Sequence, residues 1–129
     1  MKKLKVGIAS YPEMKARTLA IARGERRRQR GEPRIWFRSV ESFAKVLSDR
    51  NRALLGLIAE EEPASLAELA DLSGRAKSNL SRTLRTLEKY RLVRLEKGPK
   101  GRVVPRVSYT DIVLDIPLVI ERHSREAKR

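Results

Sequence analysis

The stretch from Ser65 to Tyr109 constrains the fold more than any other part of this 129-residue chain. Ser65 occupies a helix N-cap position and Glu68 follows three residues later, a spacing at which each side chain can accept the free backbone N–H of the other residue. One face of this short helix carries the apolar residues Leu66, Leu69, Ala70 and Leu72. Ser73 and Gly74 follow, and glycine enters a left-handed C-cap at little steric cost, so we expect the helix to end near Gly74.

A second helix is predicted over about residues 76–90, and its two faces differ in chemistry. Leu80, Leu84 and Leu87 recur at positions i, i+4 and i+7, so they line one buried stripe. The opposite face is rich in Ser, Asn, Lys and Arg, although Ser and Asn form helices poorly because their side chains compete for backbone hydrogen bonds. Arg can bind guanine, Asn can bind adenine, and Ser and Lys reach phosphates. Contact with DNA therefore explains this face better than the alternative, an ordinary polar helix surface.

A basic hairpin is predicted directly after this helix. Residues 92–96 alternate apolar and charged side chains as a half-buried strand does. Residues 97–102 form a glycine-containing turn with three cations, and residues 103–109 can return antiparallel to the first strand. Pro105 has no N–H to donate, so we expect the return strand at an edge or a bulge.

The order helix, turn, helix and basic hairpin predicts a winged helix-turn-helix that binds double-stranded DNA. We expect the helix over residues 76–90 to lie in the major groove and the wing over residues 97–102 to contact the backbone or the minor groove. The predicted base-reading residues are Ser78, Asn79, Arg82 and Arg85. The predicted backbone contacts are Lys77, Ser81, Lys89, Lys97, Lys100 and Arg102, and Arg75 completes the DNA-binding set.

Two segments, residues 66–75 and 78–93, resemble the MarR-like winged-helix regulators of prokaryotes. The matching patterns read Leu-Ala-Glu-Leu-Ala-x-Leu-Ser-Gly-Arg and Ser-Asn-Leu-Ser-Arg-Thr-Leu-x-Thr-Leu-Glu-Lys-Tyr-x-Leu-Val. The resemblance implies a transcriptional regulator whose recognition helix carries the face between Lys77 and Lys89. Arg91 departs from the pattern, since relatives commonly carry glycine there, and a left-handed Arg91 would cost about 1 kcal/mol.

Further segments, residues 36–42, 45–48 and 101–105, resemble a group of small predicted transcriptional regulators of prokaryotes. Some members of that group look like antitoxins encoded beside a toxin. This resemblance leaves open an alternative function, in which the chain binds a partner toxin and also represses its own operon.

The charge distribution agrees with a nucleic-acid partner. The chain has 30 Lys and Arg against 16 Asp and Glu, a formal net charge of +14 that attracts polyanions. Residues 1–40 carry +9, residues 41–74 carry −4 and residues 75–106 carry +9. The cations therefore concentrate on the N-terminal part and on the predicted helix and wing. An RNA-binding protein is a second alternative, because phosphate contacts alone do not distinguish RNA from DNA.

The sequence contains no catalytic or metal-binding pattern. It has no Cys and a single histidine, His123, which lies in a polar tail without a carboxylate at ligand spacing. The turn at residues 98–101 is too short for a phosphate-binding loop, and residues 60–62 are typical of a solvated acidic helix end. We therefore expect no enzyme and no cofactor. No apolar run approaches the roughly 20 residues of a membrane span and no signal peptide is recognisable, so we expect a cytoplasmic protein without a membrane partner.

The predicted fold class is α+β: a winged helix-turn-helix with an N-terminal strand-helix extension and a C-terminal strand. Residues 1–33 provide the extension and a basic linker, for dimerisation or as a DNA arm; residues 34–117 form the DNA-binding domain, and residues 118–129 form a charged tail. In the extension, Leu4, Val6 and Ile8 alternate as a strand does, and a helix follows from Pro12 toward Gly24.

The second alternating segment contains Ile112, Leu114 and Ile116 and ends at Pro117. It can pair with the N-terminal strand within one chain or between two chains. We favour pairing between two chains, because a short recognition module gains specificity when a homodimer reads two half-sites.

Three features lie between the extension and the predicted helix-turn-helix. Residues 24–33 are a cationic linker, interpreted either as a solvated charge run or as an arm that follows DNA phosphates. Residues 34–40 are predicted to form a strand in which Trp36 packs among apolar neighbours rather than stacking on a base. Residues 41–61 form a helical region with core positions Phe43, Val46, Leu47, Leu54, Leu55 and Ile58.

Overall fold

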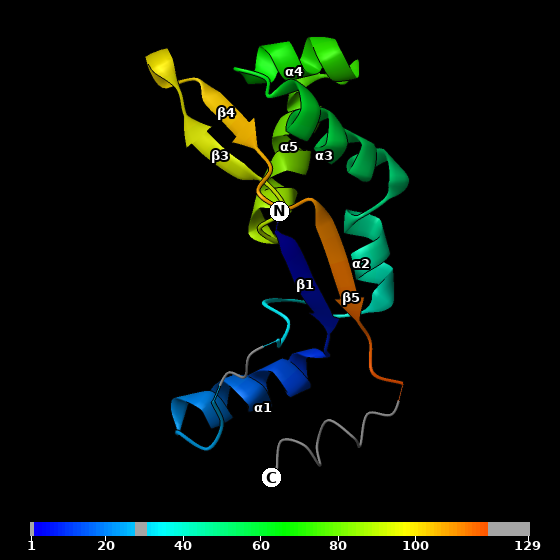
Figure 1. Ribbon diagram of the computed structural model, residues 1–129, viewed down its shortest axis with the longest axis vertical. Coiled ribbons are helices and arrows are strands. Elements are labelled where there is room, and N and C mark those ends of the chain that lie inside the picture. Colours follow the sequence, from blue (N-terminus) through cyan, green and yellow to red (C-terminus); the bar gives the residue numbers. More distant parts are fainter. Residues whose placement is uncertain (1, 28–30, 119–129) are drawn as a thin grey trace. The chain divides into compact units, whose positions relative to one another are not determined.

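The structure is a computed structural model that describes residues 2–27 and 31–118 (Figure 1). Five α-helices and five strands lie within these residues, so the mixed α and β composition is as expected. The chain divides into two compact units. Among the described residues, we call 3–27, 31–43 and 111–118 the sheet unit, and 2 and 44–110 the helix-hairpin unit.

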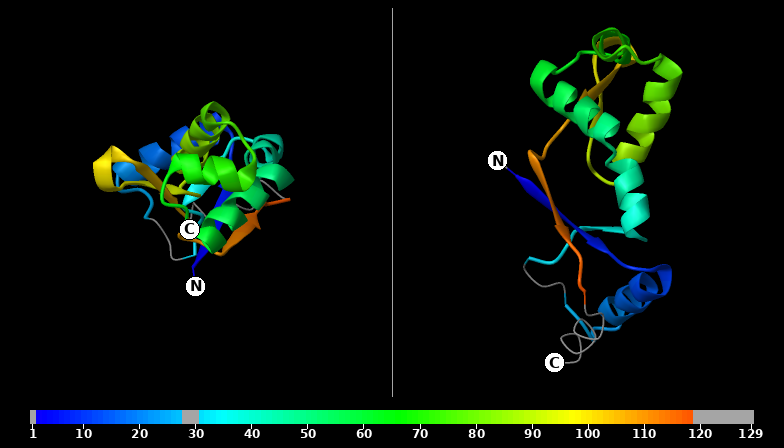
Figure 2. Two further views of the ribbon diagram at one scale, coloured as in Figure 1. Left: turned by 90° about the horizontal axis from the view of Figure 1, so that it is seen from above. Right: turned by 90° about the vertical axis from the view of Figure 1, so that its right-hand side faces the viewer.

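Three parallel strands form the sheet of the sheet unit. β1 (Lys3–Ile8) lies in the middle and pairs with β2 (Ile35–Phe37) on one side and with β5 (Asp111–Asp115) on the other. β1 and β5 lie side by side in Figure 1, and the right-hand view of Figure 2 shows the same two strands crossing in projection. The sheet therefore joins segments from both ends of the described chain.

The alternating apolar residues explain the register of this sheet. Leu4 pairs with Ile112 and Val6 pairs with Leu114, so all four side chains lie on one face. Phe37 of β2 pairs with the last residue of β1 and adds to the same face. Leu4, Val6 and Phe37 are each only 1% exposed, which makes them the centre of the core of this unit.

The pairing of β1 with β5 corrects one expectation and shifts two boundaries. The two strands pair within one chain, so the preference for pairing between two chains is wrong: the apolar face of each strand is already completed by the other. The boundaries expected at residues 33 and 117 separate β1 from β2 and β5, whereas the three strands share one sheet. Pairing between distant segments leaves no local signal that would have placed these boundaries.

The helix after β1 has the predicted position. α1 (Tyr11–Ala22) starts at the N-cap Ser10, whose Oγ accepts the N–H of Glu13. Pro12 stands in the first turn, where its missing N–H removes no helical hydrogen bond. The chain leaves the helix through Gly24, which has a φ of 74°. The expected helix from Pro12 toward Gly24 is therefore confirmed.

Trp36 packs against the sheet, as expected. A Cβ atom added to Gly7 would lie 2.6 Å from Cζ3 of Trp36, so only glycine leaves room for the indole ring. The Arg17 guanidinium lies 5.1 Å from the centroid of the same ring, within the range of a cation–π contact. The strand itself is shorter than predicted, because β2 covers only three residues of the expected range 34–40.

The helical region expected over residues 41–61 is divided into two helices. α2 (Val40–Val46) ends before Ser48, and α3 (Asp49–Glu61) begins after it. The Oγ of Ser48 accepts the N–H of Asn51 at 3.2 Å and so caps α3. The capping serine interrupts the helix although the apolar periodicity continues across it.

α4 (Leu66–Ser73) confirms the predicted boundaries, with one difference in its cap. The Oγ of Ser65 accepts the N–H of Glu68 at 3.1 Å, and Gly74 forms the left-handed C-cap with a φ of 72°. The carboxylate of Glu68 accepts the N–H of Ala64 at 3.0 Å instead of that of Ser65. The start of α4 is therefore still held by two hydrogen bonds, one accepted by Ser65 and one accepted by Glu68.

α5 (Lys77–Lys89) follows within the predicted range, and its leucine stripe joins the core of the helix-hairpin unit. Leu72, at the last turn of α4, is 44% exposed and lies outside this core, unlike Leu69, which is fully buried. The almost fully buried apolar side chains of the unit include Leu54, Ile58, Leu69, Leu80, Leu84, Leu87, Leu92 and Val93.

The predicted hairpin is present but shorter than expected. β3 (Arg94–Lys97) and β4 (Val103–Arg106) are antiparallel and are joined by a turn that contains the short 3-10 helix η1 (Pro99–Gly101). Pro105 pairs with Leu95 in this two-stranded sheet, where both strands are edges and a missing N–H is tolerated. In Figure 1 the tip of the hairpin projects away from α5.

Candidate nucleic-acid interface

The two faces of α5 differ as the sequence predicts. Leu80, Leu84 and Leu87 are 0%, 1% and 0% exposed, so the leucine stripe is sealed against the rest of its unit. Burying a leucine side chain stabilises a fold by about 1.5–3 kcal/mol, so this stripe fixes the rotation of α5 about its axis. The rest of the helix surface carries the exposed side chains Lys77, Ser78, Asn79, Arg82, Arg85 and Lys89, and the half-buried Ser81, and of these Arg82, Arg85 and Lys89 lie opposite the stripe.

The first turn of α5 has free backbone donors. Its N-cap is Ala76, which offers no side-chain hydrogen bond to the N–H groups of the first turn. Free N–H groups and the helix dipole favour anions at this end. Lys77, Ser78 and Asn79 surround these groups and are exposed. The beginning of α5 is therefore positive both through its side chains and through its backbone.

The end of α5 confirms the conformation considered for Arg91. Arg91 has a φ of 60°, its N–H donates to Glu88 O, and the N–H of Leu92 donates to Leu87 O at 2.9 Å. These two hydrogen bonds form a Schellman motif, which usually places glycine at the left-handed position. Arg91 occupies this position without the conformational freedom of glycine, so the C-cap carries backbone strain.

The hairpin tip presents its three predicted cations to solvent. Lys97, Lys100 and Arg102 are all exposed. The N–H of Gly98 donates to Arg102 O at 2.7 Å, and Lys100 has a φ of 60°. A Cβ atom added to Gly98 would lie 2.7 Å from a methyl group of Val104, so any larger residue here would force Val104 to shift. The cations are thus held on a compact turn.

Arg75 has a different environment from the other ten candidate residues. Its guanidinium donates to Asn51 Oδ1 at 3.4 and 3.5 Å and to Arg50 O at 3.2 Å, and its side chain is partly buried. Burial and the neighbouring charge of Arg50 lower the pKa of Arg75 below its usual value. Sequence reasoning missed this contact, because Asn51 is distant in the chain and nothing in its local pattern points to Arg75.

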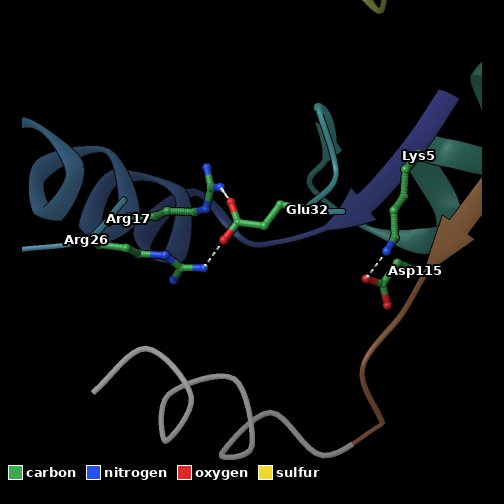
Figure 3. Close-up of polar contacts among 5 residues, drawn as sticks. All are labelled: Lys5, Arg17, Arg26, Glu32 and Asp115. Carbon is green, nitrogen blue, oxygen red and sulfur yellow. Dashed lines mark hydrogen bonds and ion pairs between the residues drawn. The ribbon is translucent and has the colours of Figure 1, made fainter. Parts of the chain in front are cut away.

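A second group of cations lies in the sheet unit (Figure 3). Glu32 accepts a hydrogen bond from Arg17 and another, at 2.8 Å, from Arg26, and Lys5 lies 3.8 Å from Asp115. Burial opposes ionisation of Glu32, but the hydrogen bonds and charges of Arg26 and Arg17 outweigh it, so the pKa of this carboxyl is lowered.

These ion pairs bear on the cationic linker of residues 24–33. Arg26 is bound to Glu32 of the same segment and is therefore neither freely solvated nor free to follow a phosphate backbone. The interpretation as an arm also rested on residues 28–30, which lie outside the described residues.

Metal-ligating side chains do not cluster in the described part of the chain. In residues 2–27 and 31–118, His, Asp and Glu side chains form no group of three or more that could hold a metal ion. His123 lies outside these residues. None of the described helices combines the length and apolar character required to cross a bilayer.

The protein therefore has a mixed α and β fold. One of its units combines the helices α3, α4 and α5 with an antiparallel hairpin that carries exposed cations. Residues 46–114, which are more than half of the chain, match the family HVO_A0114. The chain therefore belongs to the HVO_A0114 family. The matched segment covers α3, α4, α5 and the hairpin, and it reaches into β5. No curated protein and no solved structure matches the chain.

Proposed function

We propose that this protein is a sequence-specific transcriptional regulator that binds double-stranded DNA through a winged helix-turn-helix. In this proposal α4, the turn at Gly74 and α5 are the helix-turn-helix, and the β3–β4 hairpin is the wing. One observation carries the proposal: α5 has a leucine stripe that is at most 1% exposed and an opposite face of exposed Arg, Lys, Ser and Asn side chains. Such a helix presents hydrogen-bonding groups at a fixed rotation, as reading a groove requires.

The roles of the residues follow from their places on α5. Arg82 and Arg85 lie opposite the buried stripe and, together with Ser78 and Asn79, read base edges in the major groove. Lys77, Ser81 and Lys89 bind the phosphate backbone on either side of them. The free N–H groups of the first turn add to these contacts, because phosphates bind well at a helix N-terminus.

The hairpin supplies a second contact in the proposed complex. Its tip carries Lys97, Lys100 and Arg102 on a turn closed by the Gly98 to Arg102 hydrogen bond. These cations bind the backbone or the adjacent minor groove and add affinity that does not depend on sequence.

Two copies of the chain bind two related half-sites in this proposal. The argument for a homodimer is that one short helix reads few base pairs, and that a symmetric pair doubles the length of the site. The strand pairing that the sequence suggested as the dimer contact takes place within one chain, so the contact between the copies lies elsewhere on the molecule.

The proposal is tested by selecting bound duplexes from a random pool at near-physiological salt, with structured RNA as competitor. Enrichment of a motif with two related halves is the expected result, and the spacing of the halves gives the geometry of the dimer. Retention of RNA in preference to every duplex would assign an RNA-binding function instead. Binding without any enrichment would defeat the claim of sequence specificity.

A pair of double variants provides a matched control for this selection. Arg82→Ala with Arg85→Ala removes two charges from the exposed face of α5, and we expect the enriched motif to disappear. Lys15→Ala with Arg23→Ala removes two exposed charges from the region of α1, and we expect the same motif to be enriched with weaker overall retention. The same loss of enrichment in both double variants would show that only net charge matters.

A further inference from the structure

Arg75 connects the turn between α4 and α5 to the beginning of α3. Its two terminal nitrogens donate to Asn51 Oδ1 at 3.4 and 3.5 Å, and one of them also donates to Arg50 O at 3.2 Å. The backbone N–H of Arg75 donates to Ser73 Oγ at 3.2 Å. Both the backbone and the side chain of this turn are therefore held, and α5 begins two residues later. We call the three side-chain hydrogen bonds the turn contact.

Asn51 is itself fixed on the other side of the turn contact. Its side-chain nitrogen donates to Val46 O at 3.0 Å, and its backbone N–H donates to the capping Ser48 Oγ at 3.2 Å. The bond to Val46 O orients the side-chain amide so that its oxygen faces Arg75. Asn51 thus connects the end of α2, the cap of α3 and the turn before α5 through its side chain and its backbone.

The partners of Arg75 are neutral acceptors. Across residues 2–27 and 31–118, the ion pairs involve other cations, and Arg75 has no carboxylate partner among them. A bidentate phosphate contact needs two free N–H donors on an accessible guanidinium, and the side chains of Arg82 and Arg85 are exposed. The Arg75 guanidinium is partly buried and already uses both terminal nitrogens within the protein.

We propose that Arg75 and Asn51 are positioning residues, which fix the direction in which α5 leaves the turn and so determine how accurately its exposed face meets a duplex. The expected effect on DNA binding rests on the proposed function. The expected effect on the free protein depends only on the turn contact. It moves Arg75 from the DNA-binding set to the scaffold that holds α5.

The first arm of the test measures binding to the selected duplex as a function of salt concentration. Arg75→Ala and Asn51→Ala are each expected to weaken binding about tenfold, since each removes a hydrogen bond to a charged group. The slope of log K against log salt should change by less than about 0.3, because no phosphate contact is lost. The double variant should bind as weakly as either single variant, since both changes break one contact.

Lys77→Ala is the matched control, because Lys77 is an exposed cation two residues from Arg75. We expect it to reduce the slope by about 0.9, the contribution of one phosphate contact. Arg75→Lys keeps the charge but loses the two-nitrogen contact with Asn51, so it should bind nearly as weakly as Arg75→Ala.

The second arm needs no DNA and follows backbone amide exchange in the free protein. The N–H of Gly74 donates to Ala70 O at 2.9 Å, and the N–H of Leu80 donates to Ala76 O at 3.0 Å, so these amides report on both sides of the turn. We expect Arg75→Ala and Asn51→Ala to accelerate exchange at both amides and to leave the Gly98 amide of the hairpin unchanged. Lys77→Ala should change none of the three.

Two results would overturn the inference. In the first, the slope of log K against log salt falls by about 0.9 for Arg75→Ala while amide exchange is unchanged. Arg75 would then be a phosphate ligand. The other is an Asn51→Ala variant that binds and exchanges like the wild-type protein. If the wild-type protein selects no duplex, the proposed function fails, and exchange at Gly74 and Leu80 still decides whether the turn contact fixes α5.

Discussion

Residues 1–40 and residues 75–106 carry the same formal charge of +9, but two arginines in the first region and two in the second have different environments. In the first region, Arg17 and Arg26 share the carboxylate of Glu32 (Figure 3). In the second region, Arg82 and Arg85 are exposed on α5 and take part in no ion pair within residues 2–27 and 31–118. A charge count therefore indicates a polyanionic partner only after the cations with internal partners have been removed.

The contrast also appears in the desolvation of the two sets. The Nε atoms of Arg17 and Arg26 are buried without a hydrogen-bond partner, so these side chains depend on Glu32 to compensate for lost hydration. Arg82 and Arg85 remain hydrated and can exchange water for a ligand at little cost. Arg17 and Arg26 therefore serve the fold of the sheet unit, whereas the side chains of Arg82 and Arg85 are exposed on α5.

Removal of the shared carboxylate is the largest change that we expect. Glu32→Gln should lower the free energy of unfolding by about 2 kcal/mol, because it leaves two partly buried guanidinium groups without an anion. Urea unfolding at neutral pH measures this loss. Glu25→Gln, which changes an exposed carboxylate of the same segment, should stay within about 0.5 kcal/mol of the wild-type protein. Equal stabilities for the two variants would remove the distinction between the cation sets.

The same ion pairs predict a pH dependence. The pKa of Glu32 is lowered from 4.5 in the folded protein, so its stabilising contribution is complete above pH 4.5 and is lost as the pH falls through the lowered value. The difference in unfolding free energy between the wild-type protein and Glu32→Gln should therefore shrink below pH 4.5. A difference that stays constant with pH would show that Glu32 does not act through its charge.

Arg82→Ala tests the other cation set. We expect a loss of about 1–3 kcal/mol in binding at one base position and a relaxed preference there, because Arg binds guanine through two hydrogen bonds. Competition between the selected duplex and its single-base variants measures the effect. Lys15→Ala, which removes one exposed charge from α1, should weaken all these duplexes equally. The same uniform weakening by Arg82→Ala would contradict its assignment as a base-reading residue.

Arg91→Gly should stabilise the protein. The left-handed φ of 60° disfavours Arg91 by about 1 kcal/mol relative to glycine, and the Schellman hydrogen bonds stay in place. Thermal unfolding should show a higher midpoint for this variant. Arg91→Ala is the control, because it removes the same charge and keeps the strain. A similar gain for both variants would assign the effect to charge repulsion at the end of α5.

Lys100→Ala should have the smallest effect. Lys100 lies at the tip of the hairpin, where one phosphate contact is proposed. The slope of log K against log salt should therefore fall by about 0.9, and binding to every duplex should weaken alike. Alanine replaces a non-glycine residue at a φ of 60°, so the turn itself should persist. Lys45→Ala, an exposed change on α2, provides the comparison. A slope that does not respond to Lys100→Ala would remove the hairpin tip from the proposed interface.

The sequence predicted the local structure of the helix-hairpin unit well, because the signals that determine it are short. The cap at Ser65, the glycine at position 74 and the leucines of α5 each act within a few residues. The left-handed Arg91 could also be anticipated, since the pattern around it favours glycine. Each of these features extends over one or two helical turns, so it can be recognised from the local sequence alone.

The features that sequence reasoning missed depend on contacts between distant segments. The parallel sheet unites β1, β2 and β5, and none of these strands carries a signal for its partner. The turn contact joins Arg75 to Asn51, and the charge of Arg75 gives no indication of this partner. Tertiary structure decides which cation has an internal partner, so the exposed face of α5 could be predicted from the sequence but the environment of Arg75 could not.

The position of β5 has a consequence for synthesis of the chain. β1 leaves the ribosome before β5, and its partner on this side is complete only when residue 115 has been added. All of α3, α4, α5 and the hairpin is synthesised between these strands, so this segment has time to fold before the sheet can close. A nascent chain paused before β5 would expose the apolar face of β1 at Leu4 and Val6 to chaperones and to other nascent chains.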